Sequence, residues 1–316
     1  MQRRNFMQQS LVTGATLLTG ATLRANATAE NAVGPNDSKP FNLQYGIHDG
    51  MFKELAGNDF LDQLKFAYDN GFRAMEDNGM MQRDKGMQEK IGNQLAKLGM
   101  SMGVFVIDAG DNWKTSFTTG KPEFTDRYLV ACKEAVEVAK RCHAKWVTVV
   151  PGYFERKIPI GIQTANVIDM LRRCAEIMEP AGLVMVIESL SDNPDLFLRY
   201  SDQGYMVCKA VNSPSCKMLF DMYHMQRNEG DIIEHIDWSW DQIGYFQIGD
   251  NPGRKEPTSG EMNYKNIFKH LYYKGYKGLL GMEHGTAGPG KEGELNLIKN
   301  YRWSDDFIKK DVPYPH

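Results

Sequence analysis

Short apolar runs alternate with longer amphipathic runs along the chain from Phe41 onward. This alternation is typical of parallel βα units, in which a helix returns the chain to the start of the next strand. It predicts eight strands, over Phe41–Ile47, Phe72–Met75, Met100–Ile107, Trp146–Val150, Val184–Ile187, Lys217–Phe220, Ile243–Phe246 and Gly278–Met282. The helices predicted between them are Asp59–Asn70, Glu89–Leu98, Thr125–Arg141, Gly161–Ala181, Asp195–Val211 and Tyr264–Lys274.

Glycines mark several of the predicted helix ends, as Asn70-Gly71, Leu98-Gly99, Ala181-Gly182 and Lys274-Gly275. Glycine adopts the left-handed backbone that ends a helix before the next strand. Eight such units could also form a doubly wound open sheet, but no G-x-G-x-x-G pattern follows the first strand and no Walker lysine loop occurs. We therefore expect a single-domain (β/α)₈ TIM barrel over residues 41–316.

The N-terminus resembles a twin-arginine signal peptide over residues 1–27. Arg3 and Arg4 precede an uncharged run over residues 11–23, and Ala25-Asn26-Ala27 follows as a cleavage pattern. The run is too short and too rich in glycine and threonine for a membrane span, which needs roughly 20 apolar residues. We expect export to the periplasm, a tail over residues 28–40, and no membrane span in the mature chain.

The charge balance argues against a nucleic-acid partner. The predicted signal carries three arginines and no acid, so its removal takes the formal net charge from −3 to −6. A nucleic-acid-binding surface would be basic. The cysteines are odd in number and show no C-x-x-C spacing, which argues against a cysteine zinc site. Cys208 and Cys216 could pair in an oxidising compartment or remain buried thiols.

A side chain able to bind a metal stands directly after each of the last four apolar runs. Glu188 follows VMVI, Asp221 follows KMLF, Gln247 follows GYF, and Glu283 follows GLLGM. In a barrel, the carboxyl ends of the strands meet at one mouth, where the active site lies. Two glutamates, an aspartate and an amide form a hard oxygen set, which suits Mg²⁺ or Mn²⁺ better than Zn²⁺. The alternative is that these four side chains act separately, as helix caps and salt-bridge partners.

Other polar residues lie near the same predicted mouth. His224 stands three residues after Asp221, and Arg254 lies in the polar loop after Gln247. We expect both, together with His48 after the first strand, to contact the substrate. Glu76 after the second strand is interpreted as structural, and His284 should point to the other side of its strand from Glu283.

Four segments carry a resemblance to a known family. They are FKELAGNDFLDQLKFAYDNGFRAMED (Phe52–Asp77), LFDMYHMQRNEGD (Leu219–Asp231), YFQIGDNPGRKEPTSGEMNY (Tyr245–Tyr264) and GYKGLLGMEH (Gly275–His284). The chain resembles the hydroxypyruvate isomerase branch of the xylose-isomerase-like TIM barrels, a group that includes ketose 3-epimerases. The similarity spans almost the whole mature chain.

The resemblance implies a metal held by Glu188, Asp221, Gln247 and Glu283, with the two glutamates moving the proton of the substrate. A metal bound to the carbonyl and hydroxyl oxygens stabilises the enediolate. One glutamate takes the proton, and a second acid returns it. The expected activity is a hydroxypyruvate-isomerase-like aldose–ketose isomerisation of a small hydroxy-carbonyl substrate.

Three other functions can be carried by the same barrel fold and are weighed against this sequence. An exported ketose epimerase or keto-sugar lyase would use the same chemistry, although such epimerases tend to carry histidine where this chain has Gln247. An abasic-site endonuclease would need a histidine-rich three-zinc site and a basic face, which seven scattered histidines and an acidic chain do not supply. A periplasmic sugar-binding protein would bind without turnover.

Overall fold

The computed structural model describes residues 39–307. The predicted signal peptide (1–27) and most of the predicted tail (28–40) lie outside these residues. Within residues 39–307, no helix combines the length and the apolar character that a membrane crossing requires.

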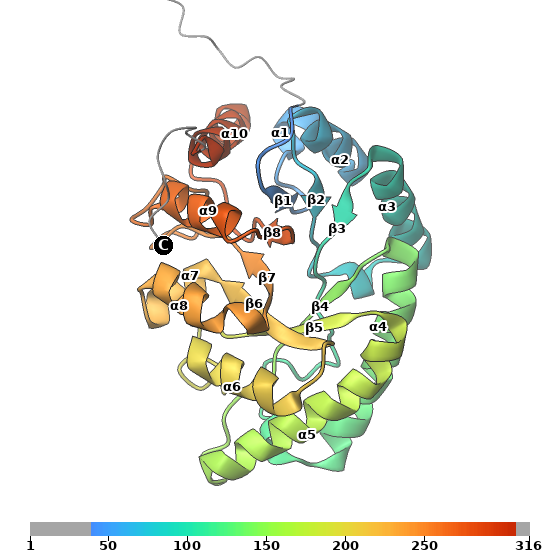
Figure 1. Cartoon of the computed structure of the whole chain (residues 1–316). Coiled ribbons are helices and arrows are strands. Elements are labelled where there is room, and N and C mark those ends of the chain that lie inside the picture. Colours follow the sequence, from blue (N-terminus) through green and yellow to red (C-terminus); the bar gives the residue numbers. More distant parts are fainter. Residues whose placement is uncertain (1–38, 308–316) are drawn as a thin grey trace, which may run out of the picture. The chain divides into compact units, whose positions relative to one another are not determined.

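Eight parallel strands form the centre of the domain, and the helices lie outside them (Figure 1). Their order in the sheet is β3-β2-β1-β8-β7-β6-β5-β4, so neighbouring strands are consecutive in the chain, the last strand pairs with the first, and β3 and β4 stand at the two ends of the order. The strands are β1 (Gln44–Ile47), β2 (Ala74–Met75), β3 (Ser101–Met102), β4 (Trp146–Val149), β5 (Val184–Glu188), β6 (Cys216–Asp221), β7 (Ile243–Gln247) and β8 (Leu279–Gly281).

The ring closes between β3 and β4. The third strand is predicted over Met100–Ile107, but its regular part ends at Met102 because the following segment changes partners. Gly103 still donates to the Met75 carbonyl of β2, whereas Thr148 of β4 donates to the Phe105 carbonyl and accepts from Ile107. Val106 and Thr148 form a parallel bridge. The predicted (β/α)₈ barrel is therefore confirmed.

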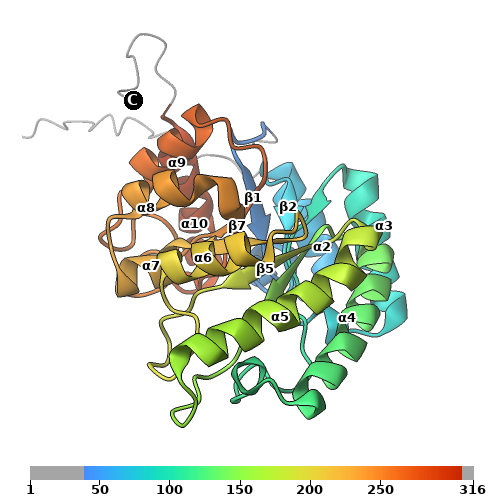
Figure 2. The ribbon, with the colours of Figure 1, turned by 60° about the horizontal axis from the view of Figure 1, so that its bottom comes forward.

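The helices surround the strands, and α3, α4, α5 and α6 lie side by side on the outside (Figure 2). The helices are α1 (Lys53–Ala56), α2 (Phe60–Asp69), α3 (Lys85–Leu98), α4 (Pro122–Cys142), α5 (Ile160–Met178), α6 (Ser201–Val211), α7 (Met222–Asn228), α8 (Ile232–Ser239), α9 (Tyr264–Tyr273) and α10 (Gly290–Asp305). Single 3-10 turns cover Met80–Gln82, Phe117–Thr119, Glu179–Ala181 and Trp240–Gln242.

The glycines predicted to end helices all have left-handed backbone. Gly71, Gly99, Gly182 and Gly275 have φ values of 93°, 66°, 68° and 81°. At Gly99 the backbone N–H satisfies the carbonyls of Ala96 and Leu95 that the helix end leaves open. The predicted helix ends before Gly71, Gly99 and Gly275 are confirmed, whereas α5 ends at Met178 and Gly182 ends the 3-10 turn Glu179–Ala181 that follows it.

One helix starts later than predicted. The sequence predicts a helix from Asp195, but α6 begins at Ser201. The backbone before it pairs with the loop after β4: Phe154 donates to the Asp195 carbonyl, and Phe197 donates to the Gly152 carbonyl. These hydrogen bonds hold the segment extended, so the backbone N–H and C=O groups that form them are not available for a helix.

The core has two layers. Alternate strand residues fill the barrel interior with the buried cluster Ala74, Val104, Val186, Leu219, Tyr245 and Leu279. A larger cluster fills the space between the strands and the helices, with Phe72, Phe220, Phe246 and Phe268 among its fully buried rings. All five cysteines are buried free thiols, including Cys208 and Cys216.

Asp305 at the end of α10 fastens the start of β1. Its carboxylate accepts hydrogen bonds from Asn42 N at 2.6 Å and from the Tyr45 hydroxyl at 2.8 Å. Burial raises the pKa of Asp305 to about 6, and the hydrogen bonds from Asn42 and Tyr45 oppose the shift.

Candidate active site

The alternation of side chains along the strands brings the predicted site residues to the barrel interior. Glu188, Asp221 and Gln247 stand two residues beyond the interior positions Val186, Leu219 and Tyr245, and strand side chains repeat with a period of two. Glu283 stands two residues beyond Gly281 of β8. Asp221 and Gln247 also face one another across the β6–β7 ladder. All four residues therefore lie at the same mouth of the barrel.

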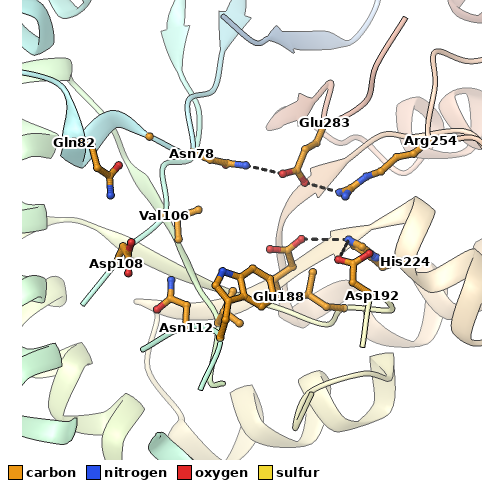
Figure 3. A pocket seen from close by; sticks show the side chains of 14 residues that line it. Asn78, Gln82, Val106, Asp108, Asn112, Glu188, Asp192, His224, Arg254 and Glu283 are labelled. Atoms are coloured by element: carbon orange, nitrogen blue, oxygen red, sulfur yellow. Dashed lines mark hydrogen bonds and ion pairs between the residues drawn. The ribbon is translucent and has the colours of Figure 1, made fainter. Parts of the chain in front are cut away.

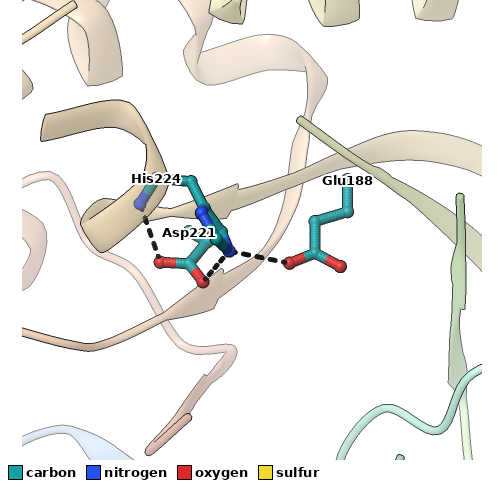
Figure 4. A group of neighbouring side chains, drawn as sticks. All are labelled: Glu188, Asp221 and His224. Atoms are coloured by element: carbon teal, nitrogen blue, oxygen red, sulfur yellow. Dashed lines mark hydrogen bonds and ion pairs between the residues drawn. The ribbon is translucent and has the colours of Figure 1, made fainter. Parts of the chain in front are cut away.

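Asp221 caps the helix that follows it and so positions His224. Its Oδ1 accepts hydrogen bonds from the backbone N–H groups of Tyr223 at 2.7 Å and His224 at 3.4 Å. Because α7 starts without an intervening loop, the His224 ring returns beside the Asp221 carboxylate (Figure 4), with Nε2 3.5 Å from Oδ2. The cap leaves Oδ2 for other partners.

Glu188, Asp221 and His224 form a compact buried group whose ligand atoms lie within 4.8 Å of one another. The His224 Nε2 is 3.9 Å from Glu188 Oε1 and has no hydrogen-bond partner. The Ser191 backbone N–H lies 3.2 Å from Nδ1 and can only donate, so Nδ1 carries the lone pair. Burial lowers the pKa of His224, more than the Asp221 carboxylate raises it. The neutral ring therefore presents Nε2–H to the carboxylates, which suits a hydrogen-bond donor better than a metal ligand.

Arg254 lies between two of the predicted metal ligands. Its Nη2 donates to Asp221 Oδ2 and to Glu283 Oε2, both at 2.9 Å. The loop that carries it is held by Asp250, whose backbone carbonyl accepts from Arg254 N and whose side chain accepts from Gly260 N. The guanidinium also lies 5.0 Å from the ring centre of Tyr223.

Glu76 orients Gln247. Its buried carboxylate accepts from Gln247 Nε2 at 3.2 Å and from the Tyr245 hydroxyl at 3.0 Å. Because Gln247 Nε2 donates to Glu76 Oε1, the NH₂ of Gln247 faces Glu76, and its Oε1 faces away. This Oε1 is buried and has no partner. Glu76 thus has a structural role, as the sequence predicts, but that role serves the site directly.

His48 contacts Glu76 through Nε2. Burial lowers the His48 pKa, but the adjacent Glu76 carboxylate outweighs this effect and the net shift is upward. The Nε2 of His284 forms a 2.7 Å hydrogen bond with the Tyr301 hydroxyl of α10. The side chain of Glu283 instead lies with the other carboxylates of the site, where it accepts a hydrogen bond from Arg254. His48 as a substrate contact stays a prediction.

The donor set fits a divalent metal ion. Glu188 and Asp221 supply buried carboxylate oxygens, and the orphaned Gln247 Oε1 is an acceptor for which the protein offers no donor. A cation would satisfy that oxygen, and an all-oxygen set favours Mg²⁺ or Mn²⁺. Arg254 links Glu283 to these ligands, because its Nη2 donates both to Glu283 Oε2 and to Asp221 Oδ2.

The two glutamates open into one cavity of about 440 Å³ (Figure 3). Asn78 Nδ2 donates to Glu283 Oε1 at 2.6 Å, so both oxygens of Glu283 are held. Burial raises the pKa of Glu283 to about 7; Arg254 opposes this shift and Asp221 adds to it. Burial, and then the Glu283 and Asp221 carboxylates, raise the pKa of Glu188 well above its usual range. Both glutamates thus lie in surroundings that favour the protonated carboxyl, and a bound cation would oppose this shift.

Sequence reasoning missed the far side of this cavity. Gln82 follows β2, and Asp108, Asn112 and Trp113 lie in the long segment between β3 and α4. Asn78 was also missed, although it stands just after the second predicted strand. Its position at a strand end is the signal that could have identified it.

Two curated relatives match most of the chain. Hydroxypyruvate isomerase of Escherichia coli (strain K12) is 28% identical over 261 residues, which cover 79% of this chain and 94% of that protein. The 2-oxo-tetronate isomerase of Cupriavidus necator is 28% identical over 255 residues, which cover 79% and 95%. The chain is thus similar to two proteins named as isomerases.

Solved structures show the same fold at lower identity. The 3-keto-D-glucoside 4-epimerase of E. coli aligns with a TM-score of 0.69 and 17% identity, covering 83% of this chain and 99% of that one. The IOLI protein, solved with a bound zinc atom, aligns with a TM-score of 0.63 and 15% identity, covering 83% and 96%. Residues 64–309 match the model of the xylose isomerase-like TIM barrels. The chain belongs to the xylose isomerase-like TIM barrel family.

Proposed function

We propose that the chain is a metal-assisted isomerase of a small hydroxy-carbonyl compound, of the hydroxypyruvate isomerase type. The observation that carries the proposal is that Glu188 and Glu283, from β5 and from the end of β8, line one cavity beside a buried oxygen-rich group. The names of both relatives support the isomerase class.

Each residue of the site has a role in this proposal. Glu188, Asp221, Gln247 and Glu283 would hold Mg²⁺ or Mn²⁺, which when bound supplies a Lewis acid for the substrate carbonyl. Asn78 and Arg254 fix the two oxygens of Glu283. His224, whose Nε2–H faces the carboxylates of Asp221 and Glu188, stays a predicted substrate contact.

The proton transfer needs two carboxyl groups in different protonation states. One glutamate, ionised, takes the proton from the hydroxyl-bearing carbon next to the carbonyl. A proton returns to the former carbonyl carbon, while the hydroxyl proton passes from one oxygen to the other. Return to the original carbon from the opposite face would instead be epimerisation, which keeps the ketose epimerase as the second candidate.

A screen in deuterated water tests the proposal. Small keto acids and keto sugars are incubated with the full chain and Mn²⁺, and deuterium incorporation is located by NMR. Isomerisation predicts a label on the carbon that was the carbonyl of the starting compound. Inversion with a label at the original carbon would indicate an epimerase, and binding without any exchange would reject catalysis of this kind.

A further inference from the structure

The loop that carries Arg254 is joined to the segment that follows Glu283. Arg254 and Glu283 meet at the cavity through one hydrogen bond of 2.9 Å, although they come from the loop after β7 and from the end of β8 (Figure 3). Lys255 and Gly285, one and two residues further along these segments, form a parallel bridge. The Gly285 N–H donates to the Arg254 carbonyl at 3.0 Å. The backbone therefore joins the two segments close to the site.

Arg254 has a backbone conformation that residues other than glycine rarely adopt. Its φ of 49° lies in the left-handed region. Such a conformation persists only where the surrounding structure holds it. The Arg254 N–H donates to the Asp250 carbonyl, and the Arg254 carbonyl accepts from Gly285. The direction of the Arg254 side chain thus depends on contacts with both its own loop and the segment after Glu283.

Glu256 supplies a second link between the same segments. Its Oε2 accepts a hydrogen bond from the Ala287 backbone N–H at 2.7 Å. Glu256 stands two residues after Arg254, and Ala287 stands four residues after Glu283. A link this close to both site residues limits how far they can move apart.

Packing alone does not account for a glutamate at this position. The Glu256 side chain is 1% exposed. Burying a carboxylate costs free energy, and an apolar side chain of similar size often stabilises such a position at least as well. The hydrogen bond from the Ala287 N–H does require an acceptor. The feature that distinguishes Glu256 from an apolar residue is therefore its link to the segment after Glu283.

We infer that Glu256 is a positioning residue, which holds Arg254 and Glu283 at hydrogen-bond distance by joining their two segments. The inference rests on the proposed function for the roles of Arg254 and Glu283. Glu256 does not line the cavity, so it acts through these two residues and not on a substrate or an ion. Loss of the link should shift the Glu283 carboxylate relative to Glu188 and weaken the site for a metal ion.

Variants of the full chain separate the acceptor of Glu256 from its packing. Glu256→Met keeps the length of the side chain without the acceptor, and Glu256→Gln keeps an acceptor. Glu256→Ala is a second loss variant, since one replacement alone could fail to fold. Without added metal, hydrogen exchange at the Ala287 amide should be at least about threefold faster in the loss variants than in the parent, and Glu256→Gln should restore the parent rate. Unchanged exchange in the loss variants would show that Glu256 does not hold this segment.

Mn²⁺ binding tests whether the link positions the site. The dissociation constant, measured from the electron paramagnetic resonance signal of free Mn²⁺, should rise about tenfold in Glu256→Met and stay near the parent value in Glu256→Gln. The matched control is Glu294→Met, which removes a buried carboxylate that accepts from the backbone N–H groups of Glu54 and Leu55, both at 2.9 Å. This control should leave Mn²⁺ binding unchanged.

Two results would overturn the inference. One is faster amide exchange in Glu256→Met with unchanged Mn²⁺ binding, and the other is an equal weakening of Mn²⁺ binding in Glu294→Met. The deuterium screen and Mn²⁺ binding by the parent judge the proposed function separately, because neither measurement uses a Glu256 variant.

Discussion

Replacing Gly281 by alanine should displace the residue that orients Gln247. A Cβ at Gly281 would lie 1.8 Å from Glu76 Oε2 and 2.2 Å from Glu76 Cδ. Attractive contacts between heavy atoms lie at about 3.5–4.0 Å. Glu76 is fully buried, so its carboxylate has to leave its hydrogen bonds with Gln247 and Tyr245.

The size of the effect follows from the bonds that are lost. A hydrogen bond to a charged group contributes about 1.5–3 kcal/mol, and overpacking a core costs about 1–3 kcal/mol. Gly281→Ala should therefore lower the free energy of unfolding by at least about 4 kcal/mol. The amide of Gln247 would lose its fixed orientation, so Mn²⁺ affinity should fall as well.

Urea unfolding and Mn²⁺ titration measure both consequences. The matched control is Gly161→Ala in α5, where an added Cβ meets nothing within 4 Å, and stability should be unchanged or rise by up to about 1 kcal/mol. Shortening Glu76 in a Gly281→Ala/Glu76→Asp double variant should recover part of the loss. A Gly281→Ala protein within about 1 kcal/mol of the parent would refute the role assigned to Glu76.

Three further changes probe separate parts of the molecule. The pKa of Asp305 is raised from 3.8 to about 6, so protonation of Asp305 stabilises the fold below pH 3.8, and this contribution is lost as the pH rises through 6. Relative to Asp305→Asn, the free energy of unfolding of the parent should fall by about 2–3 kcal/mol between pH 4 and 7 in urea titrations. A difference between the two proteins that does not change with pH would contradict this. Arg254→Ala should lower kcat/KM without lowering metal content, because removing a cation from two carboxylates cannot weaken binding of a second cation; loss of the metal on elemental analysis would argue otherwise. We propose export by the twin-arginine route, so the double variant Arg3→Lys/Arg4→Lys should remain in the cytoplasmic fraction. An undiminished amount of this variant in the periplasmic fraction would reject the proposed route.

The strand ends were predictable because the barrel imposes a strong rule on them. One polar residue after an apolar run can also be a helix cap, as Asp221 is. Four consecutive strand ends with oxygen-bearing side chains instead indicate one shared site, and Glu188, Asp221, Gln247 and Glu283 all lie at one mouth. The predictions of a TIM barrel and of an isomerase are confirmed by the closed ring and by the named relatives.

The helices that sequence analysis missed are short or weakly apolar. The helix α7 spans seven residues and starts directly after β6, and α10 carries few apolar residues along its length. The pattern of apolar residues is then too weak to mark them. The late start of α6 could not be predicted from local sequence. The hydrogen bonds that hold the preceding segment extended come from the loop after β4, which is far away in the sequence.

Long-range contacts also explain what was missed in the site. Glu76 contacts Gln247 across a separation of 171 residues, and Asn78 contacts Glu283 across 205. No local pattern encodes these partners.

Solvent exchange in glutamine variants tests the central claim, that Glu188 and Glu283 move the substrate proton. Glu188→Gln and Glu283→Gln keep side-chain size and one oxygen but remove the base. With the substrate from the deuterium screen, at least one variant should lose exchange by about 10²-fold or more, while the exposed Glu134→Gln control retains the parent rate. Exchange near the parent rate in both variants would show that neither glutamate carries the proton.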